Sequence, residues 1–305
     1  MGAVAVEVVE LRKSYGAVEA VRGISLSVAE GEVFALLGPN GAGKTTTVEI
    51  LEGFRRRDSG RVSVLGFDPA HGDRKLKEQL GIVLQTSGVD PYLTVAETVD
   101  MFRGYYPKPR PRDEVLELVG MTEKKDARVT KLSGGQRRRL DVAIALAGDP
   151  RLLFLDEPTS GFDPGARRQA WEVIKGLAGL GKTIFLTSHS MDEVQYLADR
   201  VVIIAAGKIV AEGAPDTLAG REKAAAIVRF QLPANVELPA VLRPAARIED
   251  GNVELETQDP TRTLYELTSW AVQSGISLEG LELTRPSLED VYLAITKDAA
   301  GSASA

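Results

Sequence analysis

One eight-residue run constrains the fold of this 305-residue chain more than any other feature. Residues 38–45 read Gly-Pro-Asn-Gly-Ala-Gly-Lys-Thr and match the phosphate-binding pattern G-x-x-x-x-G-K-[ST] at every position. The apolar residues 33–37 precede this run, and the helix-compatible residues 46–51 follow it. The alternative, a glycine-rich turn without a ligand, is disfavoured because the motif and both flanks agree. The segment therefore predicts a strand, a phosphate-binding loop and a helix.

The residue types of this loop suit an anion. Glycine has no Cβ, so the backbone can bend until successive N–H groups point inward, and the following helix adds its positive dipole end. Lys44 is predicted to reach the β- and γ-phosphates, and the Thr45 hydroxyl to bind Mg²⁺. We expect a nucleoside triphosphate to contact residues 38–46, which are Gly38, Pro39, Asn40, Gly41, Ala42, Gly43, Lys44, Thr45 and Thr46.

Composition limits the class of partner. The formal net charge of −6 argues against nucleic acid, because a phosphate backbone requires a basic face. The basic runs 55–57 and 137–139 are expected to lie on solvated faces. The chain has no cysteine, which excludes disulfides and thiolate metal sites. No apolar run approaches the ~20 residues that span a bilayer, so any membrane role is expected to need a partner protein.

Two further motifs carry polar groups to places where ligands bind. Residues 132–136 read Leu-Ser-Gly-Gly-Gln before an alanine-rich segment, and such a helix start is either an anion site or a plain N-cap. Residues 152–157 read Leu-Leu-Phe-Leu-Asp-Glu, a buried strand that brings two carboxylates to the ligand-binding edge of a sheet. Asp156 suits a Mg²⁺ ligand, and Glu157 suits a base that polarises the attacking water. The alternative is a strand end followed by an acidic turn.

Taken in order, the three motifs resemble those of the ATP-binding cassette (ABC) ATPases, over about residues 4–220. The resemblance implies that Lys44 and Glu157 act in catalysis. It also implies that the signature motif of one subunit closes over the ATP held by the phosphate loop of another. The signature residues are Ser133, Gly134, Gly135 and Gln136.

Smaller motifs extend the resemblance. It implies that Tyr15 stacks on adenine and that His189 contacts the γ-phosphate during catalysis. Gln85 is implied to meet Mg²⁺ and the catalytic water, and to begin the loop that contacts the membrane partner. The loop implied to cross the dimer interface consists of Ser160, Gly161, Phe162 and Asp163, with Phe162 where the family more usually has leucine.

The resemblance implies an α/β fold for residues 1–222, a P-loop ABC ATPase domain with a RecA-like core, an antiparallel β subdomain and an α-helical subdomain. The patterns themselves predict helices and strands in the same segment. Strands are expected at 4–9, 24–28, 33–37, 61–65, 82–84, 152–155 and 184–186, and helices at 95–129 with a break at 107–111, at 136–147 and at 167–180.

The pattern of apolar and polar residues changes after Gly213, and residues 223–298 are predicted to form a small α+β domain. A strand is expected at 227–232, a hairpin within 248–256, a helix at 263–273 and a final helix capped by Ser287. Residues 283–293 resemble the ending of bacterial drug-resistance-type ATPases, which include daunorubicin exporters. A dimerisation or regulatory role is implied for this domain. The tail 299–305 is predicted to be disordered.

The function implied by the resemblance is hydrolysis of ATP with Mg²⁺ by a homodimer. This dimer would power export of a drug-like or lipophilic substrate through a separate permease, on the cytoplasmic face of the cell membrane. A heterodimer is the alternative assembly. A translation or DNA-maintenance ABC ATPase is the alternative function, disfavoured by the single cassette, the acidic balance and the lack of a heptad run. A regulatory nucleotide-binding module without turnover is disfavoured by Glu157 and His189.

Overall fold

The computed structural model describes residues 3–84, 88–218, 225–233, 236–249, 251–285, 287–290 and 292. The chain divides into two compact units, Met1–Pro215 and Asp216–Ile295. The predicted tail 299–305 lies outside the described residues.

A six-stranded sheet forms the centre of the first unit, in the order β5-β6-β7-β3-β8-β9. Neighbouring strands are parallel from β5 to β8, and β9 is antiparallel to β8. The inner strands are continuous apolar runs because both faces of a parallel sheet are covered. The strands are β3 (Val33–Leu37), β5 (Leu80–Val83), β6 (Leu152–Asp156), β7 (Thr183–Ser188), β8 (Arg200–Ala205) and β9 (Lys208–Gly213).

A three-stranded antiparallel sheet, in the order β2-β1-β4, shares a hydrophobic core with the large sheet. Its strands are β1 (Val4–Tyr15), β2 (Val18–Ala29) and β4 (Ser59–Val64). Their alternating buried and exposed residues follow from having one covered face. The core continues into the large sheet through Phe34 and Phe185, whose ring centroids lie 4.9 Å apart.

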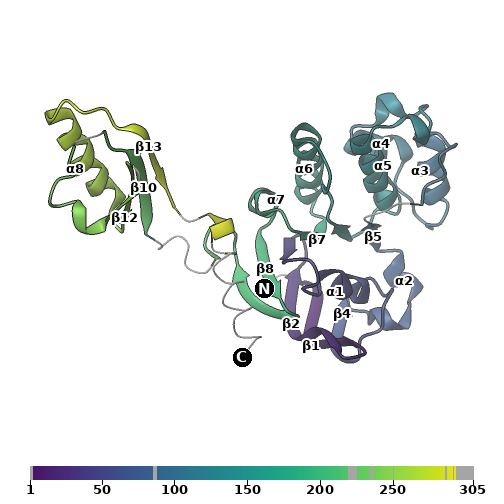
Figure 1. Cartoon of the computed structure of the whole chain (residues 1–305). Coiled ribbons are helices and arrows are strands. Elements are labelled where there is room, and N and C mark those ends of the chain that lie inside the picture. The colour runs from purple at the N-terminus through teal and green to yellow at the C-terminus, as the bar shows by residue number, and fades with distance from the viewer. Residues whose placement is uncertain are drawn as a thin grey trace. The chain divides into compact units, whose positions relative to one another are not determined.

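Some helices lie beside these sheets, and others form a group of their own to one side (Figure 1). Helix α1 (Lys44–Leu51) follows β3 and contacts strands of both sheets, while α2 (Arg74–Lys77) precedes β5. Helices α3 (Val95–Arg103), α4 (Arg112–Leu118) and α5 (Gly134–Leu146) pack on one another as a helical subdomain. Helix α6 (Pro164–Gly179) contacts α7 (Met191–Leu197), which packs on β3 and β7. Short 3-10 helices lie at Pro69–His71, Thr122–Lys124 and Val129–Lys131.

The second unit is a four-stranded antiparallel sheet, in the order β11-β12-β10-β13, with one long helix. Its elements are β10 (Ala226–Gln231), a 3-10 turn at Arg243–Ala245, β11 (Ala246–Glu249), β12 (Asn252–Thr257), α8 (Pro260–Gln273) and β13 (Glu279–Thr284). The inner faces of β10 and β12 and the α8 residue Leu267 form a separate hydrophobic core. Ser287 caps residues 288–290 through its hydroxyl, which accepts the Asp290 N–H at 3.1 Å.

The expected α/β architecture is confirmed, including the antiparallel β subdomain and the helical subdomain. Several elements differ in extent from the expectation, among them β2, which begins at Val18 rather than at residue 24, and the sequence does not predict α7, β8 or β9. Strand β1 runs to Tyr15, beyond the predicted end at residue 9, because irregularities in its pairing with β2 let the two strands stay paired. The helical pattern predicts that the helix continues to residue 129, but α4 ends at Leu118. Residues Thr122–Lys124 form a 3-10 turn instead.

Candidate functional site

The phosphate loop joins the buried end of β3 to the first turn of α1. Gly43 has a φ of 104°, and a Cβ at this position would lie 2.4 Å from the carbonyl oxygen of Ala20. Only glycine therefore fits at the start of α1, where orphan N–H groups are available for an anion. Thr45 is exposed one residue beyond Lys44.

Lys44 lies across its own loop. Its Nζ donates to the carbonyl oxygens of Gly38 at 2.7 Å and Pro39 at 3.2 Å, and the residue is only 6% exposed. Burial lowers the pKa of Lys44, while the charges of Glu157 and Asp156 act in the opposite direction. These two carboxylates thus lie near the predicted phosphate-binding lysine, at the same edge of the sheet.

Asp156 and Glu157 are held at the end of β6 by the neighbouring strand β7. The Thr187 hydroxyl donates to Asp156 Oδ1 at 2.5 Å and accepts the backbone N–H of Glu157 at 3.1 Å. Glu157 has a φ of 44°, in the left-handed region that non-glycine residues rarely adopt. Its carboxylate lies 3.3 Å from His189 Nδ1. The structure therefore brings Glu157 and His189 together, with His189 on the exposed side.

The oxygen donors at this edge fit Mg²⁺. A P-loop Mg²⁺ takes a hydroxyl, a carboxylate held at the end of a strand, waters and phosphate oxygens, so it needs no cluster of acidic side chains. Thr45 and Asp156 are of these two donor types. Among the described residues there is no group of three or more His, Cys, Asp or Glu side chains suited to a metal.

Tyr15 lies at the end of β1 beside the first turn of α1. Its hydroxyl is 3.5 Å from the hydroxyl of Thr46, and its ring is 40% exposed. Lys13 Nζ and the Arg55 guanidinium lie 5.5 Å and 5.2 Å from the ring centroid. The ring is thus accessible for stacking next to the phosphate loop. Gln85, the remaining predicted Mg²⁺ and water contact, lies outside the described residues.

The signature motif occupies the N-terminus of α5. The Ser133 hydroxyl accepts the Gln136 N–H, and the Gln136 side chain accepts the Ser133 N–H at 3.0 Å. This capping box satisfies two backbone donors reciprocally. Gly134 and Gly135 carry no side chain, and both line an open hollow beside Ser133 and Gln136.

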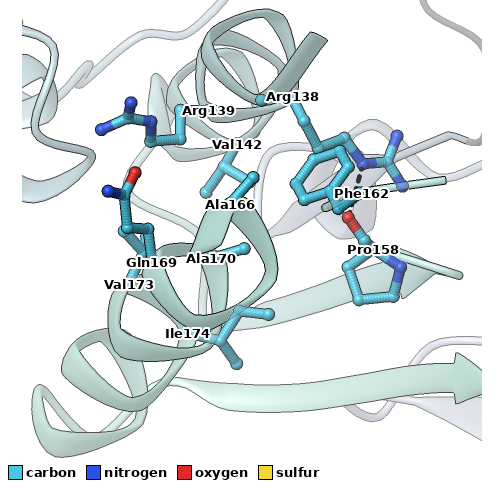
Figure 2. Close-up of a pocket in the computed structure, with 11 residues that line it drawn as sticks. Arg138, Arg139, Val142, Pro158, Phe162, Ala166, Gln169, Ala170, Val173 and Ile174 are labelled. Atoms are coloured by element: carbon cyan, nitrogen blue, oxygen red, sulfur yellow. Dashed lines mark hydrogen bonds between the residues drawn. The ribbon is translucent and has the colours of Figure 1, made fainter. Parts of the chain in front are cut away.

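The predicted interface loop forms the other wall of this hollow. Gly161, Phe162 and Asp163 line it. Ser160 is the first residue of the loop, and its backbone N–H donates to the Glu157 carbonyl. The Asp163 carboxylate accepts the N–H groups of Gly165 and Ala166 and so caps α6. A second, apolar groove continues between α5 and α6, and Figure 2 shows Phe162 and Pro158 at one end of it with Arg138.

Comparisons with known proteins match both units of the chain. A family model described as ABC transporter matches residues 21–160, and one described as ABC transporter domain-containing protein-like, C-terminal domain, matches residues 226–287. A daunorubicin resistance ATP-binding protein (DrrA2) of Streptomyces coeruleorubidus is 37% identical over 97% of this chain and 96% of its own length. The chain belongs to the ABC transporter ATP-binding family.

Another relative and two solved structures support the same family assignment. A Nod factor export ATP-binding protein I of Rhizobium sp. (strain N33) is 39% identical, over 97% of this chain and 98% of its own length. The crystal structure of the ADP conformation of MJ1267, an ATP-binding cassette of an ABC transporter, has a TM-score of 0.61 at 25% identity, covering 69% of this chain and 91% of that one. The structure of cbiO1 from Clostridium perfringens has a TM-score of 0.61 at 29% identity, covering 70% and 90%. The chain is thus an ATP-binding and ATP-hydrolysing subunit.

Two residues of this cassette have contacts that the sequence does not predict. Thr187 bridges Asp156 and Glu157, although the sequence predicts a role only for His189, two residues further on. Arg138 is 9% exposed, which corrects the expectation that residues 137–139 form a solvated face. Its guanidinium lies among backbone carbonyls at the ends of two strands, while Arg137 is exposed. A triple-arginine run gives no signal that distinguishes its central member, because helix rotation and the facing strands decide which side chain is buried.

Proposed function

We propose that two copies of this chain sandwich ATP between the phosphate loop of one copy and the signature motif of the other. The hollow beside the signature motif supports this proposal. Of the described residues that line it, none belongs to the phosphate loop 38–45; they come from residues 133–139 and 161–169. Each helix N-terminus is therefore one half of an anion site, and a second copy supplies the missing half. Homodimerisation is the simpler assembly because one chain carries both motifs.

In this dimer the residues take separate roles. Lys44 binds the β- and γ-phosphates, and Thr45 and Asp156, with Gln85, hold Mg²⁺, which neutralises phosphate charge when bound. Glu157 accepts a proton from the attacking water, and His189, 3.3 Å from it, orients Glu157 and contacts the γ-phosphate. Tyr15 stacks on adenine. The assignment rests on the meeting of Lys44, Glu157 and His189 at one sheet edge.

Export is the transport direction we propose, with a drug-like or lipophilic substrate. The support comes from the names of the relatives, a daunorubicin resistance protein and Nod factor export proteins, which match this chain over nearly its whole length. Among the described residues, none of the helices has the length and apolarity needed to cross a bilayer. We propose that a separate permease carries the substrate and that the ATPase binds this permease at the cytoplasmic face of the membrane.

Subunit complementation tests the sandwich. Lys44→Ala disables the phosphate loop, and Ser133→Arg fills the hollow at the signature motif while leaving the loop intact. Neither variant is expected to hydrolyse Mg-ATP alone. An equimolar mixture is expected to regain turnover, because a mixed dimer has one complete composite site. A mixture as inactive as its components would contradict the proposal.

Glu157→Gln provides a second test. The amide retains hydrogen bonding but cannot accept a proton, so we expect turnover to fall at least ~100-fold while ATP binding persists. Size-exclusion chromatography with Mg-ATP should then show a dimer for this variant and a monomer without nucleotide. Steady-state hydrolysis near the wild-type rate would remove Glu157 from its proposed role.

Transport itself needs a membrane readout. Inside-out vesicles from cells that produce this chain and its permease should accumulate daunorubicin with Mg-ATP, and vesicles with Glu157→Gln should not. Equal accumulation in both preparations would refute ATP-driven export of this substrate class by the chain.

A further inference from the structure

Arg138 is a buried cation that joins the signature helix to the catalytic edge of the sheet. It extends from the second turn of α5, and its Nε donates to the Pro158 carbonyl at 3.2 Å (Figure 2). One terminal nitrogen donates to the Asp156 carbonyl at 2.8 Å and, more weakly, to the Glu157 carbonyl at 3.5 Å. The other donates to the carbonyl of Leu84. The guanidinium thus reaches four backbone carbonyls on two separate segments.

Three of these acceptors lie just beyond the ends of strands β5 and β6, and the fourth, Asp156, is the last residue of β6. Leu84 directly follows β5, and Glu157 and Pro158 directly follow β6, so their carbonyls have left the strand ladder. A buried carbonyl without a donor is costly, and a planar guanidinium satisfies several at once with fixed geometry. Burial lowers the pKa of Arg138, and the charges of Asp141, Asp156 and Glu193 counter that effect. Arg138 Nη1 lies 3.9 Å from Asp141 one turn further along α5.

In the proposed sandwich the two ends of this connection belong to two different ATP sites, one shared with the partner's phosphate loop and one at this chain's own loop. Ser133–Gln136, at the start of α5, form the signature motif, while Glu157 is the predicted base. The acceptor Leu84 immediately precedes Gln85. A shift of α5 would therefore move the guanidinium and, through it, the backbone at Leu84 and at residues 156–158.

We propose that Arg138 is a positioning residue that couples the placement of the signature helix to the placement of Glu157, a role that rests on the proposed ATP sandwich. Arg138 contacts no nucleotide in this scheme. It holds the carbonyls after β6 in the geometry in which Glu157 faces His189, and it transmits the seating of the partner subunit's ATP on α5 to that geometry.

The test compares three variants in steady-state ATPase assays and thermal unfolding. Arg138→Met removes all donors while keeping the aliphatic stem, and Arg138→Lys keeps the charge but not the planar fork. Arg137→Met is the matched control, since Arg137 is exposed. We expect Arg138→Met to lower kcat by about tenfold or more with KM for ATP changed less than about threefold, because phosphate-loop binding is untouched. Arg138→Lys should recover part of kcat, and Arg137→Met should match wild type.

A second measurement separates coupling from folding. In a Glu157→Gln background, Arg138→Lys is expected to shift the ATP concentration for dimerisation upward while its thermal midpoint stays near that of Arg137→Met. If Arg138→Met does not fold, this comparison and the kcat of Arg138→Lys decide the question. Both Arg138 variants having the kcat of Arg137→Met would overturn the role. A kcat loss that only follows the unfolded fraction would overturn it too. Absence of ATP-dependent dimers in Glu157→Gln alone would instead refute the sandwich.

Discussion

At the scale of single residues, two glutamates show how surroundings decide what a carboxylate does. Glu157 is held by Thr187 in a left-handed backbone conformation, and such local strain is typical of functional sites. Glu52 directly follows α1 and is 7% exposed. Burial, aided by the charges of Asp156 and Glu49, raises the pKa of Glu52 to about 8. A carboxyl of this kind is neutral at neutral pH.

Glu52 makes stability depend on pH. Its pKa is about 8 in the folded chain against an ordinary value of 4.5 for a glutamate, so between these values the folded state binds more protons than the unfolded state. Unfolding free energy therefore falls as pH rises through this window. We expect Glu52→Gln, which cannot ionise, to reduce that fall by a few kcal/mol between pH 5 and 8, at ~1.4 kcal/mol per pKa unit. Urea unfolding of wild type and Glu52→Gln at pH 5 and pH 8 measures this change in unfolding free energy. Parallel pH dependence in both proteins would contradict the assignment.

At the scale of elements, a buried carboxylate fixes α6 and α7 to the catalytic edge. Glu193 of α7 accepts hydrogen bonds from Thr159 at 2.6 Å, from Ser188 at 2.6 Å and from Trp171 Nε1 of α6 at 3.2 Å. The Trp171 ring also stacks on Tyr196, with centroids 5.1 Å apart. Because Ser188 precedes His189 and Thr159 follows Pro158, the packing of the two helices sets the positions of both catalytic segments.

Trp171→Phe tests this arrangement. Phenylalanine retains a buried ring but leaves the Glu193 carboxylate with one donor fewer, and we expect a loss of about 1–3 kcal/mol in unfolding free energy. Tyr196→Phe is the control, because its hydroxyl bonds Glu172 at the exposed surface and should cost less than about 0.5 kcal/mol. Urea titration of both variants compares them. Equal losses of unfolding free energy in the two variants would show that the buried Trp171 N–H does not stabilise the protein more than the exposed Tyr196 hydroxyl.

At the scale of the whole molecule, the hydrophobic core of the two sheets in the first unit and the core of the second unit share no residue in the described part of the chain. The motifs predicted to bind and hydrolyse ATP all lie in Met1–Pro215, and the second unit contributes a sheet, a helix and the residues around Ser287. Separate cores allow the first unit to fold alone. We propose that residues 223–298 support dimerisation or regulation, since their family model is distinct from that of the cassette.

Truncation tests that role. A chain that ends at residue 222 keeps the phosphate loop, the signature motif and the core around Phe34, so we expect it to fold and bind ATP. Its ATP-dependent dimer, measured by sedimentation in the Glu157→Gln background, is expected to be weaker than that of the full chain. It should therefore dissociate at a higher protein concentration. Unchanged dimerisation, ATPase rate and vesicle transport would exclude the role.

Local chemistry was readable from the chain alone. The phosphate loop, the apolar strand ending in Asp156 and Glu157, and the turn between Glu249 and Asn252 each depend on residues close in sequence. Backbone propensity and hydrophobic pattern act at that range, which is why the α/β architecture and the family could be predicted. The site roles assigned by resemblance stay predictions, and Gln85 lies outside the described residues.

Tertiary structure decided the partners of polar groups that are far apart in sequence. Arg138 meets Leu84 across 54 residues and Thr187 meets Asp156 across 31, and no local pattern encodes either contact. Burial singled out Arg138 from its two arginine neighbours and raised the pKa of Glu52, because the dielectric surroundings of a charge are set by which elements pack over it. The sequence by itself determined which groups are predicted to bind phosphate; the packing of α5, β6 and β7 decided how the residues around them are held together.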